Sequence, residues 1–276
     1  MRLLVPSIAL LAILSASCNN TSSGNKSAKN DSAAATPITL KDVPASPQYP
    51  DAQLSITSMK ATPAGKDSTK ISFNFGVKNY ELMAQTADAN SKECSNSDKG
   101  QHIHFILDNK PYAALYEPKY EVTVPNNTEH ELLCFLSRSY HESVKSPGAM
   151  TLTHFKITDK GALEKMETPK TPMLFYSRPK GDYLAKDTSN VLLDFYPVNA
   201  TLGADYKVKA EVKNETNGKT ANFTIDNWKA NFLEGLGTGT ITVNLILEDK
   251  SGAPVSGEYG AVSRTIHLAA SEPMKN

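Results

Sequence analysis

Two histidines separated by one residue, His102 and His104, are the residues of this chain best suited to chemistry. They open the segment HIHFIL, whose apolar residues predict a β-strand, and side chains two residues apart on a strand point to the same face. The two imidazoles would then lie roughly 6–7 Å apart. That spacing suits one shared metal ion, and imidazole is a good ligand for copper and zinc.

A third metal ligand would have to come from further along the chain. His141, His130 and Glu142 are the candidates, provided that the downstream strand lies beside the one that carries the histidine pair. The same residues also permit an interpretation without a metal, in which one histidine bonds backbone groups at the rim of a sheet and the other is solvated. A bulge that turned one imidazole to the other face would favour this second interpretation.

Two Ser-Arg segments indicate a different chemistry, the binding of an anion. Arg138 lies in SRSYHESVK and Arg178 in YSRPKGDY, and a guanidinium group offers a planar fork of donors to phosphate or carboxylate. If the two segments converge at a domain junction, both arginines would bind one acidic small molecule or peptide. Alternatively, they pair with Asp194 and Glu142 and fix the orientation of the domains.

The sequence contains none of the short motifs that mark common catalytic and nucleotide-binding sites, such as Gly-x-Ser-x-Gly, the P-loop, the Rossmann glycines or His-Glu-x-x-His. We therefore expect a binding module and not an enzyme. The candidate ligand-binding residues are His102, His104, Arg138, Tyr140, His141 and Arg178, and the candidate metal ligands among them are His102, His104 and His141. Copper or zinc is the cofactor that such a set implies.

The elements that must position these residues are predicted to be strands throughout. Apolar and polar residues alternate with a period near two, and Gly, Pro, Asn and Asp separate the segments. The pattern predicts an all-β fold of two immunoglobulin-like antiparallel β-sandwich domains, over residues 50–158 and 166–270. The expected strands cover residues 54–57, 71–77, 102–107, 120–124, 131–136, 152–157, 173–176, 191–196, 206–212, 222–225, 240–247 and 262–268.

The start of the chain is typical of a secreted lipoprotein. Arg2, an apolar run and small residues form a signal peptide over residues 1–17, and Cys18 directly follows it, as in a bacterial lipobox. We expect the Cys18 thiol to be acylated, which would attach the chain to a lipid bilayer, while the polar residues 18–49 form a flexible linker. An ordinary secreted protein is the alternative, because Ser15 and Ser17 stand where a lipobox usually has Leu and Gly or Ala.

The charge balance and the cysteines limit the partners and the cysteine chemistry that we expect of this chain. The 29 basic residues balance the 29 acidic ones and form no basic stripe, so nucleic acid is not an expected partner. Besides Cys18 the chain has Cys94 and Cys134, and the sequence leaves open whether they form a disulfide or Cys134 is buried and unpaired. No Cys-x-x-C motif is present, which argues against a thioredoxin-like or zinc-finger role.

Four ordered blocks carry a resemblance to a known family. They are CSNSDKGQHIHFILDNKPYAALYE, FLSRSYHESVK, MLFYSRPKGDY with LLDFYPVN, and IDNWKANFLEGL. The chain resembles a family of uncharacterised Bacteroidota lipoproteins that also goes under the description phosphopeptide-binding protein. Forkhead-associated domains read phosphothreonine with Ser-Arg-x-His, whereas here two residues separate Ser137-Arg138 from His141. The resemblance therefore implies an envelope lipoprotein without implying an activity.

Taken together, these patterns predict a membrane-anchored, non-catalytic binding module of a Gram-negative envelope. Its ligand is unidentified, and a copper- or zinc-handling protein that uses the His102/His104 pair is the alternative. The residues after Cys18 lack the acidic charges of surface-exposed Bacteroidota lipoproteins. We therefore expect an outer-membrane lipoprotein that faces the periplasm, with the cell surface as the alternative.

Overall fold

The computed structural model describes residues 36–271, so the predicted signal peptide, Cys18 and most of the predicted linker lie outside the described residues. Within this range, no helix is long and apolar enough to cross a membrane. Short 3-10 turns span Ala89–Ser91, Pro147–Ala149 and Ala185–Thr188. The strands are β1 (Thr39–Asp42), β2 (Gln53–Pro63), β3 (Ser68–Lys78), β4 (His102–Leu107), β5 (Ala113–Leu115), β6 (Lys119–Pro125), β7 (Thr128–Ser137), β8 (Met150–Ile157), β9 (Leu163–Lys165), β10 (Met173–Arg178), β11 (Asp182–Leu184), β12 (Val191–Val198), β13 (Tyr206–Asn214), β14 (Thr220–Ile225), β15 (Asn231–Glu234), β16 (Gly239–Asp249) and β17 (Ala261–Ala269).

Strands β2 to β9 form the first sandwich. A sheet of order β2-β3-β6 faces a sheet of order β5-β4-β7-β8-β9, and all their pairings are antiparallel. Alternate residues of β3, namely Ile71, Phe73 and Phe75, are buried against Leu132 and Leu136 of β7 and their neighbours. This period-two burial is what the alternating sequence predicts for a sheet with one apolar face.

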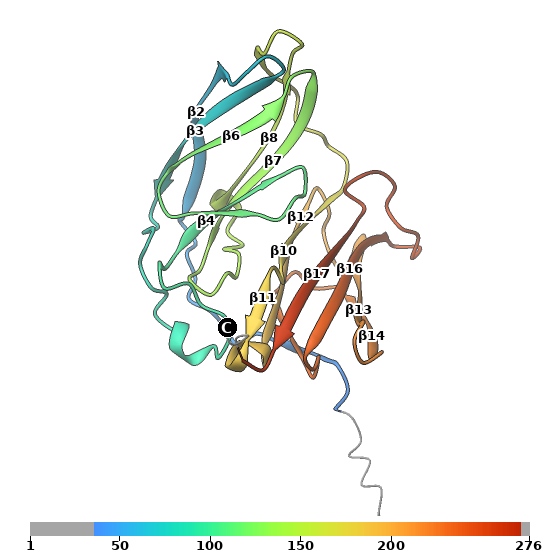
Figure 1. Ribbon diagram of the computed structural model, residues 1–276. Coiled ribbons are helices and arrows are strands. Elements are labelled where there is room, and N and C mark those ends of the chain that lie inside the picture. The colour runs from blue at the N-terminus through green and yellow to red at the C-terminus, as the bar shows by residue number, and fades with distance from the viewer. Residues whose placement is uncertain (1–35, 272–276) are drawn as a thin grey trace, which may run out of the picture. The chain divides into compact units, whose positions relative to one another are not determined.

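The second sandwich uses the remaining strands. One sheet has the order β1-β15-β12-β10 and the other the order β11-β17-β16-β13-β14 (Figure 1). Its core includes Leu193 of β12, Val212 of β13 and Val243 of β16. All pairings are antiparallel except that of β11 with β17, which is parallel. The predicted all-β fold of two immunoglobulin-like sandwiches is confirmed.

Strand β4 is buried on both of its faces, and this determines where the histidine pair lies. Ile103, Phe105 and Leu107 point into the core of the first sandwich. Ile106, on the opposite face, packs in a second cluster with residues of the other sandwich such as Phe175. His102 and His104 share the parity of Ile106, so they face the junction between the two sandwiches.

The strands predicted from the sequence are found in the predicted order, whereas the predicted boundaries of the two sandwiches are not exact. All twelve expected strands are present. The prediction that residues 18–49 form a flexible linker is wrong for residues 39–42, because β1 pairs with β15 and Ile38 beside it is 7% exposed. The polar stretch between the sandwiches also contains β9, beyond the predicted boundary at residue 158.

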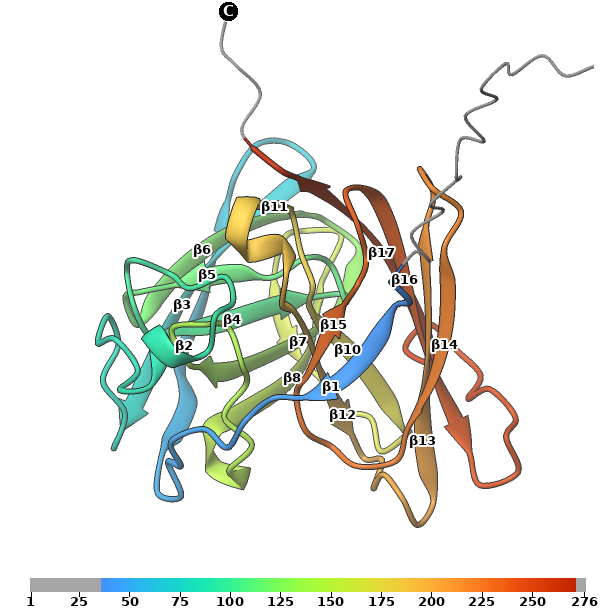
Figure 2. The same ribbon diagram turned by 90° about the horizontal axis from the view of Figure 1, so that it is seen from below.

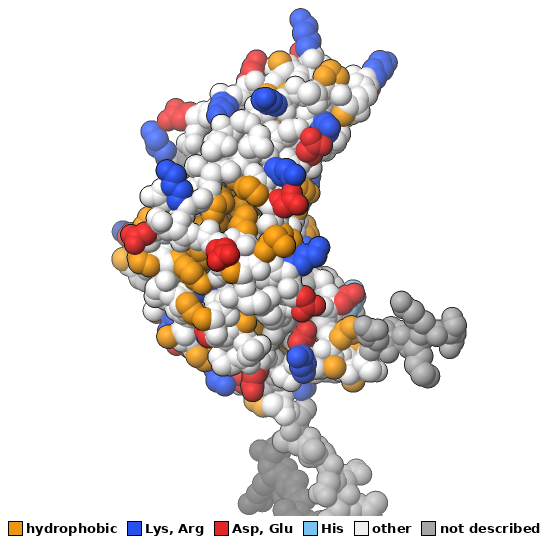
Figure 3. Space-filling view, turned by 90° about the vertical axis from the view of Figure 1, so that its left-hand side faces the viewer, with side chains coloured by type: hydrophobic (Ala, Val, Ile, Leu, Met, Phe, Trp, Pro, Cys, Tyr) orange, Lys and Arg blue, Asp and Glu red, His pale blue; other side chains and the backbone are white. Residues whose placement is uncertain are grey.

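Charged side chains of both signs surround a band of hydrophobic side chains on one face of the molecule (Figure 3). This mixture agrees with the balanced composition of 29 basic and 29 acidic residues.

Candidate metal centre

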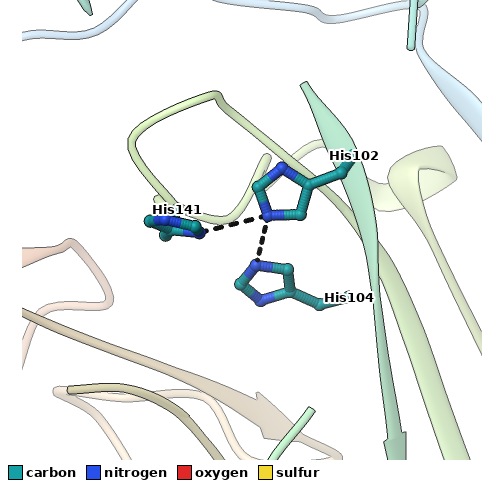
Figure 4. A group of neighbouring side chains, drawn as sticks. All are labelled: His102, His104 and His141. Carbon is teal, nitrogen blue, oxygen red and sulfur yellow. Dashed lines mark hydrogen bonds between the residues drawn. The ribbon is translucent and has the colours of Figure 1, made fainter. Parts of the chain in front are cut away.

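Three imidazoles converge at the junction of the sandwiches. The Nε2 atoms of His102 and His104 lie 2.9 Å apart, and Nδ1 of His141 lies 3.1 Å from Nε2 of His102 (Figure 4). The three candidate ligand atoms all lie within 4.8 Å of one another. Within residues 36–271, this is the only group of three histidine, cysteine or acidic residues that is compact enough to hold a metal ion.

A strand positions two of the histidines, and a turn positions the third. His102 and His104 are consecutive same-face residues of β4, which is paired with β7 along its whole length. His141 lies in the tight turn after β7, where its backbone has a φ of 71° and its N–H donates to the carbonyl oxygen of Arg138. This left-handed turn brings the chain back beside β4, so a loop residue completes the pair on the strand.

The outer nitrogens of the strand pair have hydrogen-bond partners that orient the rings. Nδ1 of His102 lies 2.8 Å from the carbonyl oxygen of Gly100, and Nδ1 of His104 lies 3.0 Å from Oγ of Ser177 in the second sandwich. A carbonyl oxygen can only accept, so Nδ1 of His102 carries the proton and Nε2 presents a lone pair to the cluster. Metal-binding histidines are usually held in this way by a second hydrogen bond.

The environment keeps the three imidazoles neutral. Burial lowers the pKa of His102 to about 4, although its bond to Gly100 acts in the opposite direction. Burial likewise lowers the pKa values of His104 and His141 well below the ordinary value. A neutral imidazole is the form that binds a metal ion, so at neutral pH no proton would have to be displaced from an imidazolium.

Tyr112 covers the cluster on one side. Its ring is stacked on that of His104 with centroids 3.6 Å apart, and its hydroxyl oxygen lies 3.2 Å from Nδ1 of His141. Its contact with the histidines could not be found from spacing, because it depends on how the loop before β5 folds back.

The metal set predicted from the sequence, His102, His104 and His141, is brought together. The two other candidates for a third ligand are not part of it: His130 contacts Asp108 at 2.8 Å, and Glu142 accepts a hydrogen bond from Ser46 at 2.5 Å. The expectation of one solvated histidine at a sheet rim is wrong, because His102 and His104 are both 0% exposed. The packing of the second sandwich against β4 is the reason.

The predicted anion-binding role of Arg138 and Tyr140 is not what the structure shows. Arg138 donates to the carbonyl oxygens of Pro47 and Ser143 and pairs with Glu142 at 3.5 Å, so its guanidinium joins the turn after β7 to the segment before β2. Tyr140 is fully buried in an apolar cluster that includes Cys94. The pairing of Arg138 with Glu142 was one of the alternatives that the sequence left open.

Arg178 lies close to the histidine cluster, and it does not converge with Arg138 on a common partner. Its Nη1 donates to the hydroxyl of Tyr183 at 3.0 Å, and its guanidinium lies 5.5 Å from the ring centre of Tyr112. The expected ion pair between Arg178 and Asp194 is not formed. The two residues lie opposite each other in the pairing of β10 with β12, but the carboxylate of Asp194 binds Nζ of Lys145 at 3.0 Å. Sequence reasoning missed Ser177, the neighbour of Arg178, since its partner His104 belongs to the other sandwich.

A second cluster of titratable groups lies on β7 and β8, away from the histidine site. Glu131 is opposite His154 in the strand register, with Oε1 of the former 3.6 Å from Nδ1 of the latter. The other carboxylate oxygen of Glu131 is buried without a hydrogen-bond partner. Burial raises the pKa of Glu131 to about 7.

The two cysteines within the described residues are both free and buried. Cys94 packs beside Tyr140, and Cys134 lies on β7 in the core of the first sandwich. The disulfide that the sequence left open is therefore not formed, and a buried unpaired Cys134 was the other alternative. Burial raises the pKa values of both thiols, which keeps them in the protonated, unreactive form.

Comparison with known proteins gives structural neighbours only. No family model matches the chain, and no curated protein matches it. Among solved structures, fibronectin(III)-like modules of Clostridium thermocellum CbhA match with a TM-score of 0.27 and 13% identity, covering 79% of this chain and 95% of theirs. The FN1–FN3 domains of chicken CNTN1 match with a TM-score of 0.26 and 9% identity, covering 79% and 67%. A two-domain fibronectin type III segment of chicken tenascin matches with a TM-score of 0.22 and 9% identity, covering 78% and 98%.

Proposed function

We propose that this chain is a non-catalytic envelope lipoprotein whose folded part binds one copper or zinc ion through His102, His104 and His141. The observation that carries the proposal is the approach of three imidazole nitrogens to within 4.8 Å of one another. The anchor is proposed on the sequence alone, from the lipobox-like residues that end at Cys18.

Hydrogen bonding alone leaves the cluster poorly satisfied. The one lone pair of His102 Nε2 faces two nitrogens, at 2.9 Å and 3.1 Å. If both neighbours donate, they crowd a single acceptor, and if Nδ1 of His141 is unprotonated, the Tyr112 hydroxyl 3.2 Å away is the only donor left to it. A metal ion bound by all three nitrogens removes this conflict.

Binding an ion requires the ligand spacing to adjust. An ion with metal–nitrogen bonds of about 2.0–2.1 Å holds its nitrogens roughly 3.3–3.6 Å apart. The two contacts of His102 Nε2, at 2.9 Å and 3.1 Å, would open by about half an ångström, and the separation of His104 from His141, which is within 4.8 Å, would close by up to about 1.5 Å. His141, on a turn, is the residue that can supply this movement. Imidazole ligands without carboxylates suit copper or zinc better than magnesium or calcium.

Competition titration with metal chelators tests the proposal. The purified chain should bind one Cu(I) or Zn(II) per molecule. The variant His141→Gln should lose at least about 100-fold in affinity, since it removes a direct ligand. His267→Gln is the matched control, because His267 is an exposed histidine on β17. Absence of binding by the wild-type chain, or equal affinity of wild type and His141→Gln, would overturn the proposal.

A further inference from the structure

Two cationic side chains, those of Arg178 and Lys180, lie beside the histidine cluster. Arg178 is 7% exposed, and its Nε has no hydrogen-bond partner. Lys180, two residues further on, donates from Nζ to the carbonyl oxygen of Tyr112 at 2.6 Å and lies 4.1 Å from the centre of the Tyr112 ring. Neither cation forms an ion pair with a carboxylate of the described residues.

Both cations lie against the ring that covers the metal ligands. The guanidinium of Arg178 is 5.5 Å and Nζ of Lys180 is 4.1 Å from the centre of the Tyr112 ring. That ring is stacked on His104 with centroids 3.6 Å apart, and its hydroxyl lies 3.2 Å from Nδ1 of His141. A phenol is uncharged at neutral pH, so the hydroxyl of Tyr112 supplies no compensating charge. An ion in this site therefore meets a positive potential and three neutral ligands.

The energy of an ion in such a potential is proportional to its charge, so the unfavourable electrostatic energy of a divalent ion is twice that of a monovalent ion. The cost of removing the ion from water rises more steeply still with its charge. Carboxylate or thiolate ligands offset this cost with ligand charge, whereas three imidazoles bring no charge and a zinc ion held by them relies on a water or hydroxide in the fourth position. Of the ions that imidazole binds well, Cu(I) is the monovalent one.

We infer that the centre selects Cu(I) over Zn(II) and Cu(II), and that Arg178 and Lys180 are the residues that set this selectivity. The inference rests on the proposed metal-binding function and adds to it the charge state of the ion. Arg178 and Lys180 do not touch the ion in this account, and they act only through their field.

The test compares Cu(I) and Zn(II) affinities of wild type, Lys180→Gln and Arg178→Gln under anaerobic conditions, with a chromogenic chelator specific for each ion. The wild-type chain should bind Cu(I) at least about tenfold more tightly than Zn(II). Removing one positive charge should increase both affinities, and the logarithm of the gain should be twice as large for Zn(II). A threefold gain for Cu(I) would thus accompany a gain of about ninefold for Zn(II). Lys250→Gln, in an exposed turn, should change neither affinity.

Equal gains for the two ions, or tighter binding of Zn(II) by the wild-type chain, would overturn the inference and leave the proposed function in place. Binding of neither ion would overturn both. Lys180 is only partly buried, so Lys180→Gln decides the question even if Arg178→Gln does not fold.

Discussion

At the residue scale, the site depends on which nitrogen of each histidine carries a proton. The carbonyl oxygen of Gly100 fixes this for His102, and Oγ of Ser177 is the corresponding partner of His104. A serine hydroxyl can either donate or accept, so it allows His104 to present a lone pair to an ion and still satisfies the ring in its absence. Ser177 is therefore a positioning residue, which acts on the ion only through the orientation of His104.

The variant Ser177→Ala tests this positioning role. We expect metal affinity to fall about 10- to 100-fold, the usual effect of removing the outer hydrogen bond of a ligating histidine. Chelator competition measures the change, with Ser263→Ala as the control because Ser263 is an exposed serine on β17. An affinity equal to that of wild type would show that the hydroxyl does not orient the ring.

At the scale of elements, the sequence predicts the long strands and misses the short ones. Strands such as β3 bury every second side chain, so the alternation is visible without a structure. Strands β1, β5, β9, β11 and β15 have three or four residues each, too few for a period of two to stand out. The same alternation predicts that His102 and His104 lie on one face of their strand, but it does not predict that this face packs against the second sandwich.

The packing of residues 38–42 against the second sandwich predicts an effect on stability. Ile38 is buried in the core of the second sandwich, so Ile38→Ala should lower the free energy of unfolding by about 2–4 kcal/mol through lost burial and a residual cavity. Lys41→Ala, at an exposed position of β1, which begins directly after Ile38, should cost less than about 1 kcal/mol. Urea denaturation measures both. Equal, small effects would mean that residues 36–42 behave as a linker.

The pairing of β7 with β8 gives a prediction about pH. The pKa of Glu131 is raised from 4.5 to about 7 in the folded chain, chiefly by burial. Its protonated form therefore favours folding, and this contribution is present below pH 4.5 and is lost as the pH rises through 7. Relative to Glu131→Gln, the wild-type chain should lose up to about 3 kcal/mol of stability between pH 4.5 and pH 8.

Urea unfolding at both pH values checks the Glu131 prediction, and Glu164→Gln on the exposed part of β9 should follow the wild-type profile. The pKa of His154, which has Glu131 and Glu129 as neighbours, is also raised. Protonation of His154 therefore also favours the folded state, and this contribution too is lost as the pH rises. A pH-independent difference between wild type and Glu131→Gln would contradict the prediction.

At the scale of the whole molecule, the junction of the sandwiches creates the site. The ligands come from β4 and the turn after β7, whereas Ser177, Arg178 and Lys180 come from the second sandwich (Figure 2). Asn109 joins the two halves again, because its amide donates to the carbonyl oxygen of Leu174 at 2.9 Å. Contacts of this kind join residues more than sixty positions apart, so no local pattern could have predicted them.

A ligand that binds only the assembled junction should stabilise the whole folded unit. At a free Cu(I) concentration of about 100 times the dissociation constant, the gain is about 2.7 kcal/mol, which corresponds to a rise in melting temperature of roughly 5–10 °C. Anaerobic calorimetry measures the shift. His141→Gln should show at most about 1–2 °C under the same conditions, because a 100-fold weaker affinity leaves only about 0.4 kcal/mol, while His267→Gln should show the full shift. A full shift in His141→Gln would place the ion elsewhere.

X-ray absorption spectroscopy of the copper-loaded chain identifies the atoms bound to the ion and therefore tests the proposed three-histidine centre. We expect a shell of three nitrogens at about 2.0 Å with the outer-shell scattering of imidazole rings. A shell containing sulfur at about 2.3 Å, or one made only of oxygen, would contradict it.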